Sequence, residues 1–391
     1  MSDKIQQIEA RIILDSRGEK TVEVSITAGD QRATAACPQG KSRGSGEAVF
    51  RPAAEAVMNI QEEIVDVLIG RSVFDQIGID KAMIELDGTD DKSRLGANAI
   101  LPVSLALAKV AAKVKGQQLW RYLRELSATT SNDSPRLLVN LINGGLHAGN
   151  DLMFQEYLAI LPGSKMTEAV NNSTRLYKKL GEKLVEQFGP TAINLGDEGG
   201  FAPLCSQDEE PFKLIMKTAD DLGLVDTITV GLDAAADNLS KNDEELIEFY
   251  HHLVETYPLE YLEDPFQEDK PESFSQLKNE IGNGVLIVGD DLTVTNPERL
   301  VQPEITTAIN GVIVKPNQIG SLSETLEAIK LTQAANWAVI ISHRSGETND
   351  DFIADLAFGV GAWGIKLGSP ARGERVAKYN RLLAIDQELV F

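Results

Sequence analysis

The sequence predicts an α/β protein, with a (β/α)8-like barrel following a smaller N-terminal α+β domain. Two observations predict this fold. Beyond about residue 130, short apolar runs end on charged residues and alternate with segments of helical spacing. Before it, polar and apolar residues alternate as in an antiparallel hairpin. A chain of 391 residues is long enough for more than one domain. We expect a cap domain over residues 1–130 and the barrel over 131–391, divided within the polar stretch 125–136.

The N-terminal part begins with a predicted hairpin over residues 21–38, "TVEVSITAGDQRATAACP", with "AGDQ" as its turn. Three segments with helical spacing follow it, at residues 46–68, 78–88 and 96–114. One hairpin followed by several helices is the composition of an α+β domain.

The C-terminal part repeats an apolar run, a charged residue and a helical segment. The charged residues that end the runs are Asp233, Glu263, Asp290, Lys315, His343 (followed by Arg344) and Lys366. Their successive spacings are 30, 27, 25, 28 and 23 residues, which suits consecutive βα units. Helical spacing lies between the runs, for example over residues 242–257 and 321–335. In a closed barrel the carboxyl ends of the strands meet at one face, so these side chains should converge on one site.

Composition and charge exclude several classes of protein. Hydrophobic residues make up 42% and charged residues 25% of the chain, as in an ordinary globular protein. We find no uninterrupted apolar stretch that could span a bilayer and no signal-peptide core at the N-terminus. Two cysteines are too few for a disulfide framework, which favours the cytoplasm. The net charge of −22 argues against binding nucleic acid or anionic membranes, so an anionic substrate needs a local cationic pocket.

The charged strand ends predict a metal site facing a cationic pocket. Three carboxylates at the ends of successive strands would repel one another without a cation, and Mg²⁺ suits oxygen ligands best. Lys315, Arg344 and Lys366 supply positive charge for a small acid that can carry a phosphate. Desolvation and neighbouring cations should lower the pKa of Lys315 and make it a base. Such a site suits removal of a proton next to a metal-bound carboxylate.

Two glycine-rich segments add candidate acids. Residues 194–203, "NLGDEGGFAP", place Asp197 and Glu198 on a tight turn, and residues 141–157 hold His147 and the pair Gln155–Glu156. Glycines let the backbone approach a ligand closely. Paired acids on such a turn fit a general acid that expels a leaving group, the alternative being a plain loop.

Several motifs resemble the enolase family, in family order and along nearly the whole chain. They include "ILDSRG", "INGGLHAGNDLMFQEY", "GDEGGFAP", "LEDPF", "VGDDLTVTN", "KPNQIGSLSETLEAI" and "SHRSGET". The resemblance implies an N-terminal α+β domain with an enolase-type barrel, dependence on Mg²⁺, and reversible dehydration of 2-phospho-D-glycerate to phosphoenolpyruvate in glycolysis. A lysine base with magnesium is the pattern already described for that superfamily. A homodimer or an assembly of dimers is also implied.

The resemblance carries roles to individual positions of this sequence. It implies Lys315 as base and Glu198 as acid, supported by Glu156, with His147 in the pocket. The implied substrate-binding residues are Gln155, His343, Arg344, Ser345 and Lys366. The implied metal ligands are Asp233, Glu263 and Asp290 for the first magnesium and Ser42 for the second.

The sequence departs from the family pattern mainly in its first loop. That loop usually reads close to "PSGAST", whereas here it is "PQGKSR", with Gln39, Lys41 and Arg43 as replacements. The segment between Asp233 and Glu263 is also shorter than usual. Because the loop gains two cations, one alternative is an enolase paralogue acting on another phosphorylated or phosphonylated acid. A second alternative is a non-catalytic scaffold, which the retained acid, base and metal positions disfavour.

Overall fold

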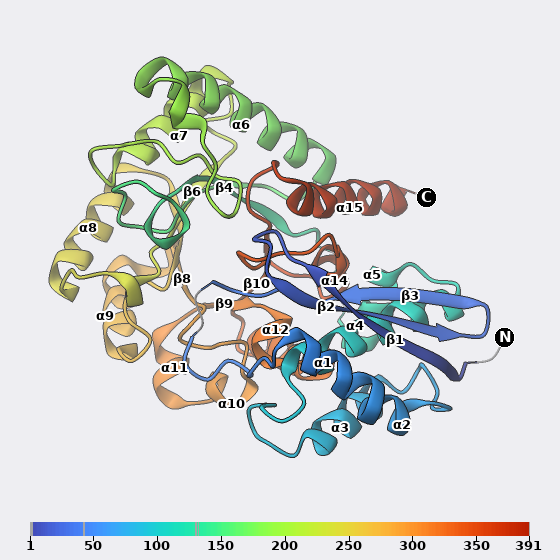
Figure 1. Ribbon diagram of the computed structural model, residues 1–391. Coiled ribbons are helices and arrows are strands. Elements are labelled where there is room, and N and C mark those ends of the chain that lie inside the picture. Colours follow the sequence, from blue (N-terminus) through green and yellow to red (C-terminus); the bar gives the residue numbers. More distant parts are fainter. Residues whose placement is uncertain (1–2, 42–43, 130, 132, 391) are drawn as a thin grey trace.

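The computed structural model describes residues 3–41, 44–129, 131 and 133–390 (Figure 1). Within these residues the chain forms a three-stranded antiparallel sheet with its helices, followed by a closed barrel of eight strands. The predicted fold class is therefore confirmed. The proposed division between residues 130 and 131 falls between the end of helix α5 at Ser127 and the start of strand β4 at Arg136, and it stays a prediction.

The N-terminal sheet has the order β1-β2-β3, with β1 at Ile5–Leu14, β2 at Lys20–Ala28 and β3 at Gln31–Ala36. The predicted hairpin is β2–β3: Ala28 pairs with Gln31, and Gly29 in the turn has a φ of 59°. Glycine takes this left-handed conformation without steric cost. Strand β1 was not expected from the sequence, because its apolar residues do not alternate regularly with polar ones, and most of its side chains are exposed or half-buried.

The helices of the N-terminal part pack on one side of this sheet. Their bounds are α1 Ala53–Asn59, a π-helical turn Ile60–Ile64, α2 Val65–Leu68, α3 Gln76–Asp87, α4 Ala97–Lys115 and α5 Leu119–Ser127. Among the described helices, only α4 has the length and apolar composition to cross a membrane. Its most apolar stretch is 83% buried and it packs against β2 and β3, as expected for the core helix of this part.

The barrel closes in the order β10-β11-β4-β5-β6-β7-β8-β9. Its strands are β4 Arg136–Asn143, β5 Glu156–Leu161, β6 Thr229–Asp233, β7 Leu259–Glu263, β8 Leu286–Gly289, β9 Gly311–Val314, β10 Ala338–Ser342 and β11 Gly364–Lys366. Seven strands run parallel, but β5 is antiparallel to both of its neighbours. The connection from β4 to β5 contains only a short 3₁₀ turn, Gly145–His147, and a parallel crossover needs a longer segment.

The reversed direction of β5 matters for the site. Its first residue, Glu156, is the Cα partner of both Asn143 at the end of β4 and Asp233 at the end of β6. A residue at the start of an antiparallel strand therefore lies at the same mouth as the residues that end its parallel neighbours.

Helices surround the barrel, and α6 to α9 lie on its side away from the N-terminal sheet (Figure 1). Their bounds are α6 Met166–Phe188, α7 Glu210–Asp221, α8 Asp243–Thr256, α9 Pro271–Ile281, α10 Pro297–Leu300, α11 Pro303–Ala308, α12 Pro316–Ile319, α13 Leu322–Ala334, α14 Phe352–Gly359 and α15 Gly373–Val390. A separate apolar cluster of buried strand residues includes Leu138, Leu158, Tyr261, Ile313 and Ile340. Such layers of strand side chains make a barrel a packed core.

Candidate active site

The barrel mouth brings the predicted charged residues to one cavity. Asp233 and Glu263 are the last residues of β6 and β7, and Asp290 directly follows β8. Lys315 follows the buried run Val312–Val314 and is the N-cap of α12, because Pro316 cannot continue the strand and suits the first helical position. The predicted residues that line the cavity are His147, Gln155, Glu156, Glu198, Asp233, Asp290, Lys315, His343, Arg344, Ser345 and Lys366. Glu263 is fully buried and contacts Lys366, while Ser42 lies outside the described residues.

Lys366 holds three carboxylates together. Its Nζ lies 2.7 Å from Glu263 Oε2, 3.0 Å from Asp233 Oδ2 and 3.1 Å from Glu156 Oε1. Burial lowers the pKa of Lys366, but the surrounding carboxylates, Asp233 first, outweigh burial and raise it well above its usual value. Lys366 is therefore a permanent cation at the centre of the mouth. Although contact with Lys366 acts to lower the pKa of Glu263, burial and the neighbouring carboxylates outweigh it and raise that pKa to about 8.

Lys315 pairs with Asp290, and Gln318 Nε2 donates to the other Asp290 oxygen at 2.9 Å. This contact corrects one expectation from the sequence. Burial and the cations Arg344 and Lys366 do act to lower the pKa of Lys315, but contact with Asp290 reverses the balance, and the pKa is raised. A base at this position thus needs the charge of Asp290 to be neutralised by another partner.

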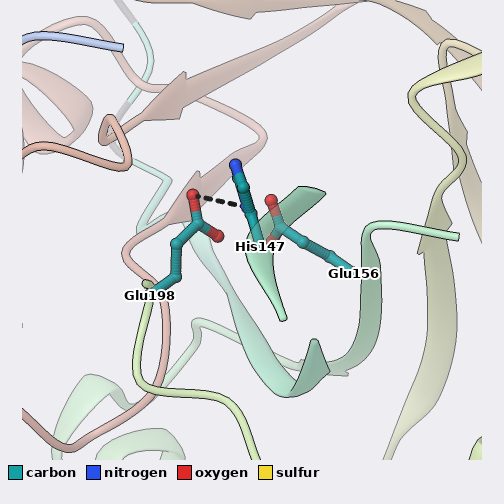
Figure 2. A group of neighbouring side chains, drawn as sticks. All are labelled: His147, Glu156 and Glu198. Atoms are coloured by element: carbon teal, nitrogen blue, oxygen red, sulfur yellow. Dashed lines mark ion pairs between the residues drawn. The ribbon is translucent and has the colours of Figure 1, made fainter. Parts of the chain in front are cut away.

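The acid side of the cavity centres on Glu198. His147 Nδ1 lies 3.5 Å from Glu198 Oε1, and His343 Nε2 lies 3.5 Å from Glu198 Oε2; Figure 2 shows the first of these pairs. Asn140 Nδ2 donates to Glu198 Oε2 at 3.0 Å. Although burial opposes ionisation, the two histidines and the neighbouring cation Arg375 hold the pKa of Glu198 well below its usual value.

Glu156 lies beside Glu198, and its pKa is shifted in the opposite direction. Burial first, and the Glu198 charge second, raise the pKa of Glu156 well above its usual value. Two neighbouring carboxyl groups whose pKa values are driven apart can hold and pass one proton between them. The acid side therefore pairs a carboxyl group that favours the ionised form with a neighbour that favours the protonated form.

The cationic side is tied to the N-terminal part. Arg344 makes a bidentate pair with Glu47, at 3.0 and 3.1 Å, and both side chains are buried. The backbone N–H of Lys41 donates to Ser345 Oγ at 2.7 Å, and Lys41 Nζ pairs with Asp197 at 3.1 Å. Lys41 thus pairs with an acid at the rim, away from the predicted metal carboxylates. Arg43 lies outside the described residues.

The donor set suits a hard divalent cation. Buried among the described residues, Gln155 Oε1 and Glu156 Oε2 are acceptors without a hydrogen-bond partner. Asp264, Asp290 and Asp291 offer oxygens within 4.8 Å of one another, and burial and neighbouring carboxylates raise the pKa of Asp291 to about 7. Crowded carboxylates and orphaned oxygens are the chemistry that a cation satisfies. The predicted set Asp233, Glu263 and Asp290 is divided between Lys366 and Lys315.

Four residues that contact or adjoin the predicted site residues escaped the sequence analysis. They are Glu47, Asn140, Asp264 and Arg375. Asp264 had an available signal, because it directly follows Glu263 at a strand end. The other three act through residues far away in sequence, so spacing could not show them.

The fold and site define a barrel enzyme with carboxylates, a lysine and buried histidines at its mouth, suited to proton transfer on a small acid. Comparison with known proteins gives the family. The description "Enolase, N-terminal domain" matches residues 5–123, and "Enolase, C-terminal TIM barrel domain" matches 134–245 and 237–390. The chain belongs to the enolase family.

Three relatives can be aligned with this chain over nearly the whole length of both proteins. The chain is 41% identical to Enolase B of Dictyostelium discoideum, over 98% of this chain and 95% of that protein. It is 42% identical to an enolase of Methanopyrus kandleri, over 99% and 96% of the two chains. It is 43% identical to an enolase of Methanothrix thermoacetophila, over 100% and 97%.

Proposed function

We propose that this mouth carries out the enolase reaction with Mg²⁺, the reversible dehydration of 2-phospho-D-glycerate to phosphoenolpyruvate. As a member of the enolase family the chain is a lyase of glycolysis, and its substrate is a small phosphorylated acid. One observation supports the residue roles above all. Lys315 follows β9 and Glu156 begins β5, four strands away around a closed barrel of eight. Because Glu156 lies beside Glu198, the proposed base and the proposed acid with its supporting carboxyl group face each other across the cavity.

The proposed division of labour follows from these positions. Lys315 takes the proton next to the substrate carboxylate, while Glu198, supplied by Glu156, gives a proton to the leaving hydroxyl group, which departs as water. Arg344 and Ser345 hold the phosphate. Gln155, His147, His343 and Lys366 orient the rest of the acid.

Magnesium belongs to the same proposal. Asp233, Glu263 and Asp290, together with Ser42, are the residues that would hold it. Bound magnesium supplies Lewis-acid stabilisation of the negative charge that develops on the substrate carboxylate. If Asp290 bound a metal ion, its negative charge would be shared with that ion and would no longer stabilise the Lys315 ammonium group to the same extent. Burial and the nearby cations would then lower the pKa of Lys315.

We also propose a cytoplasmic homodimer or an assembly of dimers. Ile12 and Leu14 on β1 are 41% and 64% exposed, which supports a surface that a second copy covers. The cysteine content remains the basis for the proposed location.

The experiment is an absorbance assay of phosphoenolpyruvate formed from 2-phospho-D-glycerate, with added Mg²⁺ and with a chelator. We expect turnover with Mg²⁺ and its loss with the chelator. A folded protein that binds Mg²⁺ but forms no phosphoenolpyruvate would favour the paralogue with another phosphorylated or phosphonylated substrate.

A further inference from the structure

Arg375, in the first turns of α15, is a fully buried cation behind the active-site loops. Its Nη1 lies 2.7 Å from His343 Nδ1 and donates to the Arg344 carbonyl oxygen at 2.6 Å. Its Nη2 donates to the carbonyl oxygens of Ser345, at 2.7 Å, and Asp197, at 3.3 Å. One guanidinium group therefore links the loop after β10 to the loop that carries Glu198.

The contact with His343 has only one chemically allowed arrangement. A guanidinium group has N–H donors, no acceptor, and stays charged at every pH of interest. At 2.7 Å, His343 Nδ1 must therefore accept the hydrogen bond and cannot carry a proton. A neutral imidazole has its single proton on the other nitrogen, and Nε2 is the atom that lies 3.5 Å from Glu198 Oε2.

The surroundings keep this imidazole neutral. Burial lowers the pKa of His343 to about 3, and Arg375 acts in the same direction, although the nearby Glu198 carboxylate opposes both. His343 is 2% exposed, and among the described residues its Nε2 has no hydrogen-bond partner. The 3.5 Å separation from Glu198 is at the outer limit of a hydrogen bond, as is common before a substrate draws a site together.

We propose that Arg375 is a positioning residue that fixes His343 as the Nε2–H tautomer, which makes His343 a permanent hydrogen-bond donor toward Glu198. The catalytic part of this inference rests on the proposed role of Glu198 as the acid. A fixed donor stabilises the carboxylate that remains after Glu198 has given up its proton. The same tautomer has no free lone pair on the cavity side, so His343 cannot take a proton there and does not compete with Lys315 as a base.

The tautomer can be measured directly in the unmodified protein. The chain has four histidines, His147, His251, His252 and His343, which makes ¹⁵N-histidine labelling and long-range ¹H–¹⁵N NMR practicable. Loss of one signal set in a His343→Gln variant identifies His343. We expect Nδ1 at the shift of a nitrogen without a proton and Nε2 at that of a nitrogen with one. A proton on Nδ1, or averaging of both nitrogens, would overturn the proposal.

Substitution of Arg375 tests whether this residue fixes the tautomer of His343. Arg375→Met removes the donor, and Arg381→Met is the matched control, since Arg381 lies on the same helix but pairs with Asp355. In Arg375→Met we expect mixed His343 tautomers and a fall in kcat of about 10- to 100-fold, the range for losing an outer-shell partner of a functional histidine, with a smaller change in KM. Arg375→Lys, which keeps a cationic donor, should recover part of both effects.

The outcomes separate this inference from the proposed function. A folded Arg375→Met protein whose His343 stays wholly Nε2–H, or whose kcat matches that of Arg381→Met, would refute the role of Arg375. If Arg375→Met does not fold, the spectrum of the unmodified protein decides. Because that spectrum requires no turnover, it stands even if 2-phospho-D-glycerate proves not to be the substrate.

Discussion

Replacing Glu47 with glutamine should destabilise the protein far more than removing a surface carboxylate. Glu47 lies in the N-terminal part and its two carboxylate oxygens contact Arg344 of the barrel at 3.0 and 3.1 Å. The side chains are 4% and 5% exposed, so water cannot replace the lost partner. The substitution keeps the shape of residue 47 but removes the carboxylate that contacts the buried guanidinium group at both of its ends, leaving Asp290 and Asp291 as the other acidic groups near it.

The size of the loss in the free energy of unfolding follows from the burial of the Glu47–Arg344 pair. Removing one partner of a buried ion pair costs about 3–5 kcal/mol. Glutamine keeps one acceptor oxygen, and one recovered hydrogen bond is worth about 1 kcal/mol. We therefore expect a loss of about 2–4 kcal/mol in the free energy of unfolding. The control is Glu55→Gln, which breaks the exposed pair between Glu55 and Arg51 and should cost at most about 1 kcal/mol.

The assay is urea unfolding of both variants, followed by tryptophan fluorescence and by far-ultraviolet circular dichroism. Because Arg344 is the proposed phosphate contact, inorganic phosphate should stabilise Glu47→Gln more than it stabilises the unmodified protein. If Glu47→Gln unfolds at the same urea concentration as Glu55→Gln, with unchanged slopes, the buried pair does not stabilise the fold as argued.

Three further predictions address the metal, pH and the first loop. Asp290→Asn should lower both Mg²⁺ affinity and activity, and an unchanged metal titration would remove Asp290 from the ligand set. Without divalent metal, stability should fall as pH rises from about 6.5 to about 8, because the pKa of Glu263 is about 8 in the folded state and 4.5 is its ordinary value, so the unfolded state has already released that proton. Asp291 acts in the same direction up to about pH 7, whereas below about pH 6.5 the lowered pKa of His343 acts in the opposite direction. A flat urea midpoint between pH 6.5 and 8 would contradict the prediction. The double substitution Lys41→Ala with Arg43→Thr should change turnover of 2-phospho-D-glycerate by less than about tenfold, or roughly 1.4 kcal/mol, whereas a gain of several hundredfold would point to another natural substrate.

The barrel was predictable because most of its strands share one repeated sequence pattern. Each of the strands β6 to β11 is a short apolar run that ends on an ionisable residue or is directly followed by one, as with Asp233, Glu263 and Asp290. The hairpin Ala28–Gln31 was predictable for a similar reason, since alternation and turn residues are both local. Strand β1 shows no such pattern, because its apolar residues, Ile5, Ile8, Ala10 and the run Ile12–Leu14, do not alternate regularly with polar ones.

The direction of β5 could not be deduced from spacing alone. A series of charged strand ends implies parallel strands throughout, whereas Glu156 begins its strand rather than ending it. The direction of the pKa shift of Lys315 was also missed. The sequence shows that cations lie nearby, but only the folded arrangement shows that Asp290 is the partner in direct contact.

The residues that support the site were the hardest to find. Glu47 acts on a residue 297 positions away, and Asn140 on one 58 positions away. Arg375 acts from a helix through the far side of His343. Their roles depend on contacts between elements distant in the chain, which no local pattern encodes.

Exchange of the proton next to the carboxylate of 2-phospho-D-glycerate, measured by NMR in D₂O with Mg²⁺, tests the assignment of acid and base most directly. Glu198→Gln should still exchange this proton while forming no phosphoenolpyruvate, because the base is intact and the acid is lost. Lys315→Ala should lose both exchange and turnover, by at least the factor of about 10²–10⁴ that general acid–base groups contribute. Exchange at the full rate in Lys315→Ala would contradict the role assigned to this lysine and, with it, the proposed mechanism.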